Sequence, residues 1–246
     1  KLIAFFVLGS LLPTAGLIYL ALNGNELGAL NATGRIDLAT IASLGIMQTF
    51  ALIATLAVSM NNVGPGFASG EAAMILARPL GRARYAMGRF IASSSITVGL
   101  CALLAVETSL PGLLTGQHRF ALLWEHWGTV AFNLVVVGAI TTMLSALVNP
   151  AALAAIAAYI FQAGAGAVAS IRGLVTGGLL KGFLADILNL AWYVTPKFLT
   201  SPLSNQQIAG IITLPRNTLG LTVWAIAYAA GALAVTAWVV QRKRVS

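Results

Sequence analysis

The chain has 246 residues, of which 59% are hydrophobic and only 8% are charged, whereas a soluble domain carries about 25% charged residues. So few charges cannot cover a water-facing surface, which excludes an ordinary soluble enzyme. The net charge of +8 fits basic residues that flank membrane spans and meet anionic lipids better than it fits nucleic-acid binding.

Six apolar segments follow one another along the chain. Each has roughly the 20 residues that a helix needs to cross about 30 Å of hydrocarbon. The predicted spans are residues 2–22, 38–60, 90–110, 128–148, 151–171 and 218–240. We therefore predict an all-α integral membrane protein with a single transmembrane domain, residues 1–246, in which Asn149-Pro150 forms a tight turn between the fourth and fifth spans.

Basic residues predict the orientation of these spans. Loop 63–89 carries four arginines and the tail, residues 242–244, carries three basic residues, and loops rich in Lys and Arg stay in the cytoplasm. Four predicted spans separate the two clusters, so both lie on one side. We therefore expect a multi-pass protein of the cell inner membrane with both termini in the cytoplasm and eight of its 14 basic residues inside.

Residues 172–217 form the longest predicted connection, on the outer side. The stretch 174–193 is apolar enough to enter the membrane. However, Lys181 and Asp186 make a complete span costly, at roughly 2.5–3.5 kcal/mol for each charge at mid-depth. Pro196 and Pro202 then interrupt any helix that follows. We expect a re-entrant or interfacial helix here, before the sixth span.

The most patterned stretch is residues 66–90, GFASGEAAMILARPLGRARYAMGRF. Ser69 or Gly70 can start a short helix with Glu71 in its first turn, where the helix dipole favours an anion. Pro79 ends that helix, because the residue before a proline resists the α conformation. By physics alone, the stretch fits an interfacial helix whose arginines bind lipid phosphate.

The same residues resemble the cytoplasmic loop of type-2 ABC-transporter permeases, particularly the branch that includes permeases for multicopper-enzyme maturation. That loop has an acidic residue, Ser-Gly, an apolar run, a basic residue before Pro, a small residue before Arg, and Gly-Lys or Gly-Arg opening the third span. The matching residues are Ser69-Gly70, Met74-Ile75-Leu76-Ala77, Arg78-Pro79, Gly81-Arg82 and Gly88-Arg89-Phe90. One position departs from the pattern, because Ala68 stands where the family has its acidic residue, and Glu71 supplies a carboxylate three positions later.

The resemblance implies the transmembrane subunit of an ATP-driven exporter, coupled through loop 63–89 to a separate ATPase subunit. It implies two permease copies, as a homodimer, and two ATPase subunits that bind ATP and magnesium. The chain has no GxxxxGK[ST] phosphate loop, so we expect it to be no enzyme by itself and to hold no cofactor. The coupling residues that the resemblance implies are Gly70, Glu71, Met74, Ile75, Arg78, Pro79, Arg82 and Arg89.

Polar residues inside the predicted spans are candidates for a translocation pathway. They are Glu107, Gln48, Asn133 and Gln162. A carboxylate in a membrane span often has a function, whereas amides more often bridge neighbouring helices. We predict no metal site, because two histidines and a glutamate in the predicted loop 115–127 do not make three or four converging ligands.

Two other functions stay open. An ion-gradient-driven secondary transporter would use acids in mid-membrane or broken helices in paired repeats, and Glu107 is the one residue that fits this mechanism. A non-transporting membrane scaffold or immunity protein would need no coupling loop, although that loop is the most patterned part of the chain.

Overall fold

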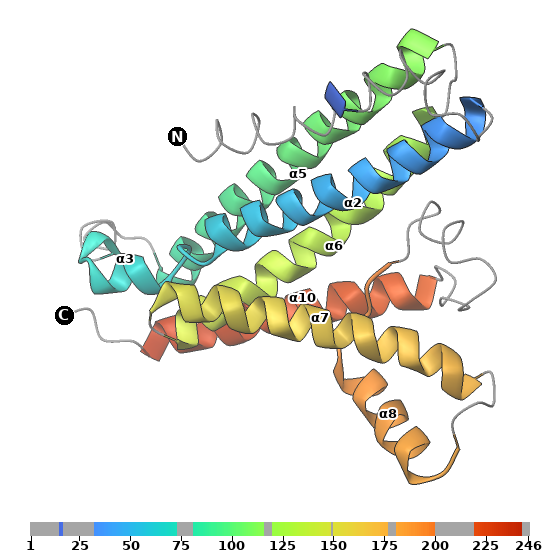
Figure 1. Ribbon diagram of the computed structural model, residues 1–246. Coiled ribbons are helices and arrows are strands. Elements are labelled where there is room, and N and C mark those ends of the chain that lie inside the picture. The colour runs from blue at the N-terminus through green and yellow to red at the C-terminus, as the bar shows by residue number, and fades with distance from the viewer. Residues whose placement is uncertain are drawn as a thin grey trace.

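The computed structural model describes residues 15–16, 32–72, 81–115, 120–148, 150–176, 181–199 and 219–242, and its regular elements there are all helices (Figure 1). In chain order they are α2 (Ala32–Ser59), α3 (Gly64–Ala68), α5 (Arg82–Thr115), α6 (Phe120–Leu147), α7 (Ala151–Thr176), α8 (Phe183–Val194) and α10 (Leu219–Arg242). Five of the described helices are long and apolar enough to cross a membrane. The predicted all-α, multi-pass membrane architecture is confirmed at this level, while the predicted span 2–22 lies outside the described residues, apart from 15–16.

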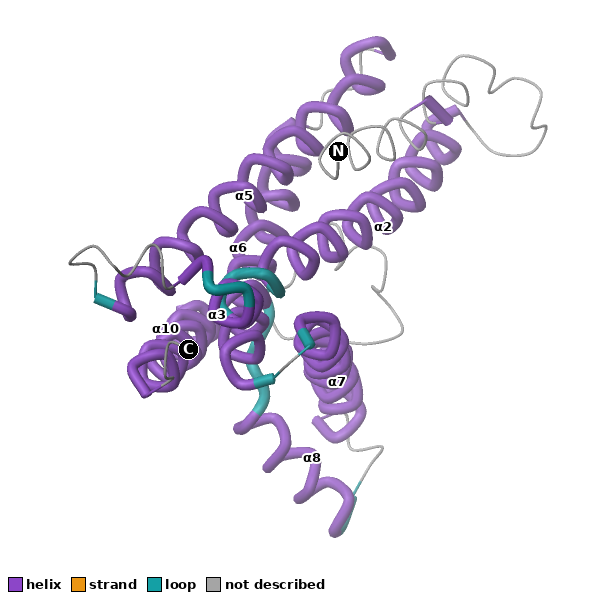
Figure 2. Tube along the Cα trace, turned by 90° about the vertical axis from the view of Figure 1, so that its left-hand side faces the viewer, coloured by secondary structure: helices purple, strands orange, loops and turns teal. Residues whose placement is uncertain are grey.

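Helix α6 lies at the centre of the bundle. Helices α5, α2, α7 and α10 all pack against it, with α2 and α5 along one side and α7 and α10 along the other (Figures 1 and 2). Small residues let the helices approach closely, as expected inside a membrane. A Cβ added to Gly138 of α6 would lie 3.2 Å from the Ser59 hydroxyl of α2. We call the end of the bundle that holds α3 the inner end, following the orientation predicted from the arginines.

The largest apolar core joins α2, α5 and α6 toward the outer end. Its α6 members, Leu123, Trp127, Val130 and Leu134, recur at the three- or four-residue spacing of one helix face. The indole N–H of Trp127 donates a hydrogen bond to Thr108 Oγ1 at 3.0 Å, so this buried polar group is satisfied. The core therefore holds three helices together over the outer half of the bundle.

Three helices begin earlier than their predicted spans, and the first of them, α2, starts at Ala32 rather than at residue 38. Helix α5 starts at Arg82 rather than at residue 90, and α6 starts at Phe120 rather than at residue 128. In α5 the extra turns are helical because Tyr85 packs in the interior, next to α3. In α6 the extra turns bury Leu123 and Trp127 in the core. Glu125 and His126, which we expected in a loop, are consequently helical.

Helix α8 forms a hairpin with α7 at the side of the bundle (Figures 1 and 2). It lies within the stretch where the sequence predicts an interfacial or re-entrant helix, and its inward residues, Ala185 and Trp192, are buried. Gly182, just before α8, has φ +79°, a left-handed conformation that glycine adopts readily. Residues 195–199 then continue without helical structure toward α6.

Candidate functional site

A cavity of about 390 Å³ lies among α2, α6 and α7, with residues 198–199 on one side of it. Three of the four polar residues that the sequence nominates for a pathway line this cavity: Gln48 on α2, Asn133 on α6 and Gln162 on α7. The three amides are far apart in sequence and come from three different helices. The structure thus brings the three amides together into one polar site inside the bundle.

Glycines provide part of the space. Gly45 of α2 and Gly166 of α7 both line the cavity. A Cβ added to Gly45 would meet no atom of the described residues within 4 Å, apart from its own helix backbone and chain neighbours. One turn after Gly45, the Thr49 hydroxyl donates to the Gly45 carbonyl at 2.9 Å. This bond uses the hydroxyl proton within its own helix, so Gln48 and Gln162 are the lining side chains with N–H groups to offer a guest.

Gln162 offers the clearest binding group. Its side-chain oxygen Oε1 is buried and accepts no hydrogen bond from any described residue. A buried acceptor without a partner costs about 1–3 kcal/mol, and such groups in native structures usually meet water or a ligand. The amide also has an NH₂ group that donates. The cavity can therefore both accept a hydrogen bond from a guest and donate one to it.

Asn133 has a different role from Gln162, because it already has partners. Its Nδ2 donates to the Leu199 carbonyl at 2.8 Å, and its Oδ1 accepts from the Leu199 N–H at 2.9 Å. Asn133 stands halfway along α6, as residue 14 of 28. Non-helical backbone at this depth needs partners for its polar groups, since no lipid can supply them. Asn133 thus fixes the segment 195–199 as a wall of the cavity.

Glu107, the fourth pathway candidate, does not line the cavity. It lies on α5 with 8% of its surface exposed. The hydroxyls of the next two residues, Thr108 and Ser109, donate to carbonyls one turn earlier in the same helix. The structure therefore separates the acidic candidate from the three amides.

At the inner end, the turn between α2 and α3 is joined to two spans by buried hydrogen bonds. The Asn62 amide Nδ2 donates to Ser93 Oγ of α5 at 2.9 Å and to Thr142 Oγ1 of α6 at 2.8 Å. Ser145 of α6 donates to the Met60 carbonyl at 2.8 Å and accepts from the Gly64 N–H at 3.1 Å. We call these residues the inner clamp.

The sequence did not identify the inner clamp as a site. Asn62 lies just after the predicted span 38–60, and Ser93, Thr142 and Ser145 belong to apolar runs. An amide and three hydroxyls in or beside predicted spans are a signal of bonding between helices. Nothing in that signal says which of the many hydroxyls face one another.

Arg89 connects α5 to the segment that follows α3. Its guanidinium donates to the Asn61 carbonyl at 3.1 Å and to the Asn62 carbonyl at 3.4 Å, and it forms an ion pair with Glu71 at 3.4 Å. Two predicted coupling residues, Glu71 and Arg89, are thus partners of each other. Their side chains are 45% and 36% exposed, so the pair remains accessible from outside the bundle.

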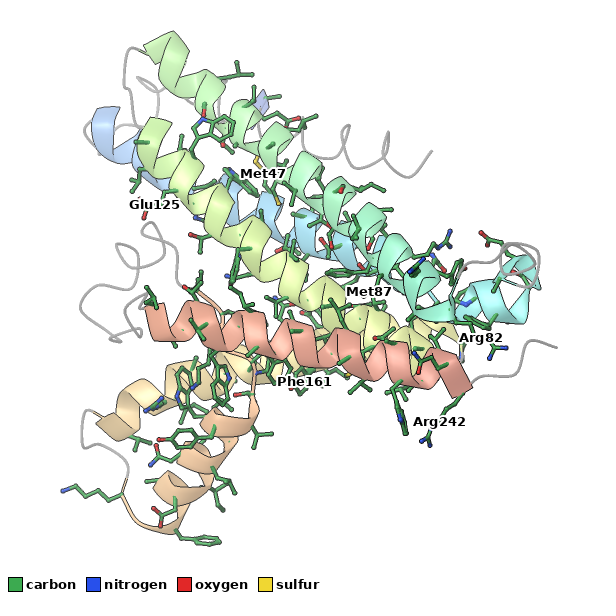
Figure 3. The ribbon with its side chains drawn as sticks, turned by 180° about the vertical axis from the view of Figure 1, so that it is seen from behind. Met47, Arg82, Met87, Glu125, Phe161 and Arg242 are labelled. Carbon is green, nitrogen blue, oxygen red and sulfur yellow. The ribbon has the colours of Figure 1, made fainter. Side chains whose placement is uncertain are left out.

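Arg82 makes a second connection at the inner end. Its Nη1 donates to the Gln241 carbonyl at 3.1 Å, near the end of α10. The negative end of the helix dipole also stabilises a cation at this position. Figure 3 shows Arg82 and Arg242 at the same end of the bundle, opposite Glu125. The predicted coupling loop therefore contacts the last described span as well as α5.

Around Gly70 one helix ends and the next begins. Helix α3, which the sequence did not predict, ends at Ala68, and the Ser69 N–H donates to the Pro65 carbonyl at 2.9 Å. Gly70 has φ +77°, which glycine tolerates and which separates the two helical stretches. Residues 71–72 are helical, so the described residues agree with the predicted helix start at Ser69 or Gly70 with Glu71 in the first turn. The remaining predicted coupling residues, Met74, Ile75, Arg78 and Pro79, lie outside the described residues.

Helix α3 packs closely on the first turn of α5. A Cβ added to Gly66 would collide with the Tyr85 hydroxyl, and the rings of Phe67 and Tyr85 meet edge to face with centroids 6.1 Å apart. Because the side chain of Tyr85 is buried, it has little freedom to move aside. Only glycine fits at position 66 without displacing α3.

No match to this chain was found among protein-family models, curated proteins or solved structures. The resemblance to type-2 ABC-transporter permeases therefore stays a prediction, carried by the loop residues alone.

Proposed function

We propose that this chain is the permease subunit of an ATP-driven transporter, an exporter, and that the amide-lined cavity belongs to its translocation pathway. The observation that carries the transport part is the convergence of Gln48, Asn133 and Gln162 on one cavity. Polar groups that face a cavity inside a membrane bundle typically mark substrate pathways. A protein that only needed helix contacts would satisfy its amides across helix interfaces instead.

The lining suggests the class of substrate. The cavity of about 390 Å³ falls at the small end of the range of about 300–1,000 Å³ for small-molecule sites. Its described lining includes amides, a threonine and apolar residues, but no charged side chain. Such a site favours an uncharged molecule, or an uncharged part of one, that accepts and donates hydrogen bonds.

The ATP-driven part rests on the loop resemblance, and the geometry of the inner end supports it. A separate ATPase that pushes on residues 61–72 would act on α5 through Arg89 and on α6 through Asn62 and Ser145. Rigid, hydrogen-bonded elements of this kind carry a displacement between distant sites. Two permease copies and two ATPase subunits would form a closed two-fold assembly.

The outer segment would supply a gate. We propose that α8 and residues 195–199 re-enter the membrane from the outer side, between the fifth and sixth spans. Phe198 and Leu199 line the cavity; two hydrogen bonds to Asn133 hold Leu199, and Phe198 packs against two apolar clusters. Breaking the two hydrogen bonds and withdrawing Phe198 from these clusters would open the cavity toward the outside, which suits release by an exporter.

The two alternatives are less well supported. A secondary transporter needs an acid where the substrate or the driving ion binds, and Glu107 does not line the cavity. A scaffold or immunity protein has no use for a polar cavity in mid-membrane. We therefore retain the permease as the proposal.

The direct test is purification of the tagged chain from its native host in mild detergent, with mass spectrometry of the proteins that co-purify. We expect a stoichiometric ATPase subunit that carries a phosphate loop. Within that complex, Arg89→Ala should lower ATPase activity, because Arg89 joins α5 to residues 61, 62 and 71; Arg84→Ala, a change on the same helix at a residue outside the predicted coupling set, should not. Repeated gentle preparations without an ATPase would overturn the proposal.

A further inference from the structure

Three aromatic rings surround the side-chain ammonium of Lys197. The ammonium lies 4.2 Å from the ring centroid of Trp224 on α10, and 5.1 and 5.6 Å from those of Trp192 and Tyr193 on α8. Each distance is within about 6 Å, the range over which a ring face attracts a cation. We call the three rings the aromatic cage. The cage is also attached to α7, because the Arg172 guanidinium lies 4.4 Å from the Trp192 centroid.

Lys197 lies at a depth where a charge is costly. Two residues later, Leu199 bonds to Asn133 in the middle of α6. Lipid at this depth supplies no partner for a polar group, and charged side chains inside a membrane protein usually face a partner within it. The attraction between a cation and a ring is stronger where water is excluded. The cage therefore gives the ammonium a favourable position, which it loses if residues 195–199 move away.

The residue after Lys197 connects the cage to the cavity. Phe198 lines the cavity and belongs to one apolar cluster with Ala225 and Tyr228 of α10. Trp224, the nearest ring of the cage, directly precedes Ala225 in that helix. Lys197 and Phe198 thus contact neighbouring positions of α10. The cage contact and the closure of the cavity by Phe198 are consequently made or lost together.

We propose that Lys197 is a positioning residue of the gate: its ammonium, held in the aromatic cage, keeps Phe198 and Leu199 against the cavity. The inference rests on the gate proposed above and adds the contact that keeps it closed. Asn133 attaches the gate to α6 by hydrogen bonds. Lys197 attaches it to α8 and α10 by its charge.

A purely structural role for Lys197 is the alternative. In that case the methylene groups of its side chain would cover apolar surface beside the rings, and the charge would contribute nothing. Substitutions separate the two roles. Methionine keeps an unbranched apolar side chain without the charge, whereas arginine keeps a charge that binds aromatic faces.

The first test measures access to the cavity without an ATPase or a substrate. The purified protein carries Cys101→Ser and Gln162→Cys, so that a water-soluble maleimide labels the cavity wall when the gate opens. We expect Lys197→Met to speed labelling about tenfold, the effect of losing the cation–ring contacts. Lys197→Arg should keep the rate within about twofold of the original. The control is Lys181→Met, which removes an exposed cation outside the cage and should leave labelling unchanged.

The outcomes distinguish the role of Lys197 from the gate itself. Unchanged labelling in Lys197→Met, or equal acceleration by Lys197→Met and Lys197→Arg, would overturn the role of the charge. If Asn133→Ala speeds labelling but Lys197→Met does not, the gate exists and Lys197 does not hold it. If neither variant speeds labelling, the gate and the role of Lys197 are both wrong. Whether an ATPase co-purifies tests the permease separately.

The second test changes the rings and keeps the lysine. Trp224→Leu should speed labelling about tenfold, and Trp224→Phe should have a smaller effect, because phenylalanine attracts a cation less strongly than tryptophan. In the double variant Trp224→Leu with Lys197→Met the effects should not add, since both changes remove the same contact.

The matched control for the ring is Trp238→Leu. Trp238 holds the Arg242 guanidinium at 4.0 Å from its centroid, so this change removes a cation–ring contact of the same helix, near its inner end. We expect labelling to keep its original rate. Additive effects of Trp224→Leu and Lys197→Met, or equal acceleration by Trp238→Leu, would show that Lys197 does not act through the aromatic cage.

Discussion

The two ends of the bundle are built by different interactions. At the inner end, two buried hydrogen bonds between side chains and one from the Ser145 hydroxyl to the Met60 carbonyl join the α2–α3 turn to α5 and α6. At the outer end, the α7–α8 hairpin projects from the bundle (Figure 1), and α8 leaves Phe183 and Leu190 80% and 67% exposed. Residues 195–199 there are attached to α6 by two hydrogen bonds between Leu199 and Asn133 and by the apolar packing of Phe198.

This difference matches the demands of transport. Buried, satisfied polar networks are rigid and costly to disrupt, so the inner clamp suits an element that transmits motion as a unit. A segment held by few bonds opens at a low free-energy cost, as moving elements must. We therefore expect changes in the inner clamp to affect global stability and changes at Asn133 to affect local opening.

The largest effect on stability is expected from Asn62→Ala. It removes two buried hydrogen bonds that no other described side chain replaces, and should lower the free energy of unfolding by about 1–3 kcal/mol. The control is Asn61→Ala, because Asn61 is exposed and its amide donates only to the Ala57 carbonyl; we expect a change within about 0.5 kcal/mol. Thermal unfolding in detergent, followed by tryptophan fluorescence, measures both. Equal effects would contradict a rigid inner clamp.

Gly66→Ala should have the next largest effect. The added Cβ collides with the Tyr85 hydroxyl, and overpacking of this kind costs about 1–3 kcal/mol. Tyr85→Phe alone should be neutral or stabilising, since the hydroxyl is buried and has no partner among the described residues. The double variant should recover part of the loss, which a double-mutant cycle of unfolding free energies measures. Strictly additive effects would show that α3 does not press on Tyr85.

Asn133→Ala should change local opening more than global stability. The backbone N–H and C=O of Leu199 lose their partner. If the closed state of residues 195–199 becomes less stable by about 1.4 kcal/mol relative to the open state, the open population rises about tenfold. The single cysteine, Cys101, can be replaced by serine so that a cysteine at position 162 reports access to the cavity. We expect a membrane-impermeant maleimide to label Gln162→Cys about tenfold faster when Asn133→Ala is also present.

The control for that experiment is Asn62→Ala in the same background. It weakens the inner clamp without touching residue 199, so labelling at position 162 should keep its original rate. Faster labelling in both variants would mean that the cavity opens by general loosening of the bundle, and the contrast between the two ends would fail.

The sequence predicted the long helices well because the membrane imposes length and apolar character on each span. It located three helix starts poorly, at Ala32, Arg82 and Phe120, because charged and polar residues there resemble a loop. Burial of Tyr85 and Trp127 decides in favour of the helix, and burial depends on the neighbouring helices, which hydropathy does not describe.

The same limit applies to the candidate site. The sequence nominated Gln48, Asn133 and Gln162 by residue type, but their convergence depends on the rotation of three helices about their axes. Nothing in the pattern distinguishes the unpartnered oxygen of Gln162 from the satisfied amide of Asn133. Glu107 was nominated by the same argument and does not line the cavity. Residue type alone therefore selects more residues than the site contains.

The smallest effect on stability is expected from Glu71→Gln. Both partners of the Glu71–Arg89 pair are more than one third exposed, and exposed ion pairs contribute only about 0.2–1 kcal/mol, less at high salt. Arg89→Ala should cost more, because the arginine also donates to two backbone carbonyls. The free energy of unfolding is measured for both variants at low and at high salt. At high salt, the stability lost in Glu71→Gln should vanish, while most of the stability lost in Arg89→Ala should remain. A salt-independent loss at Glu71 would place this carboxylate in the rigid inner clamp rather than on the accessible surface where a partner subunit would bind.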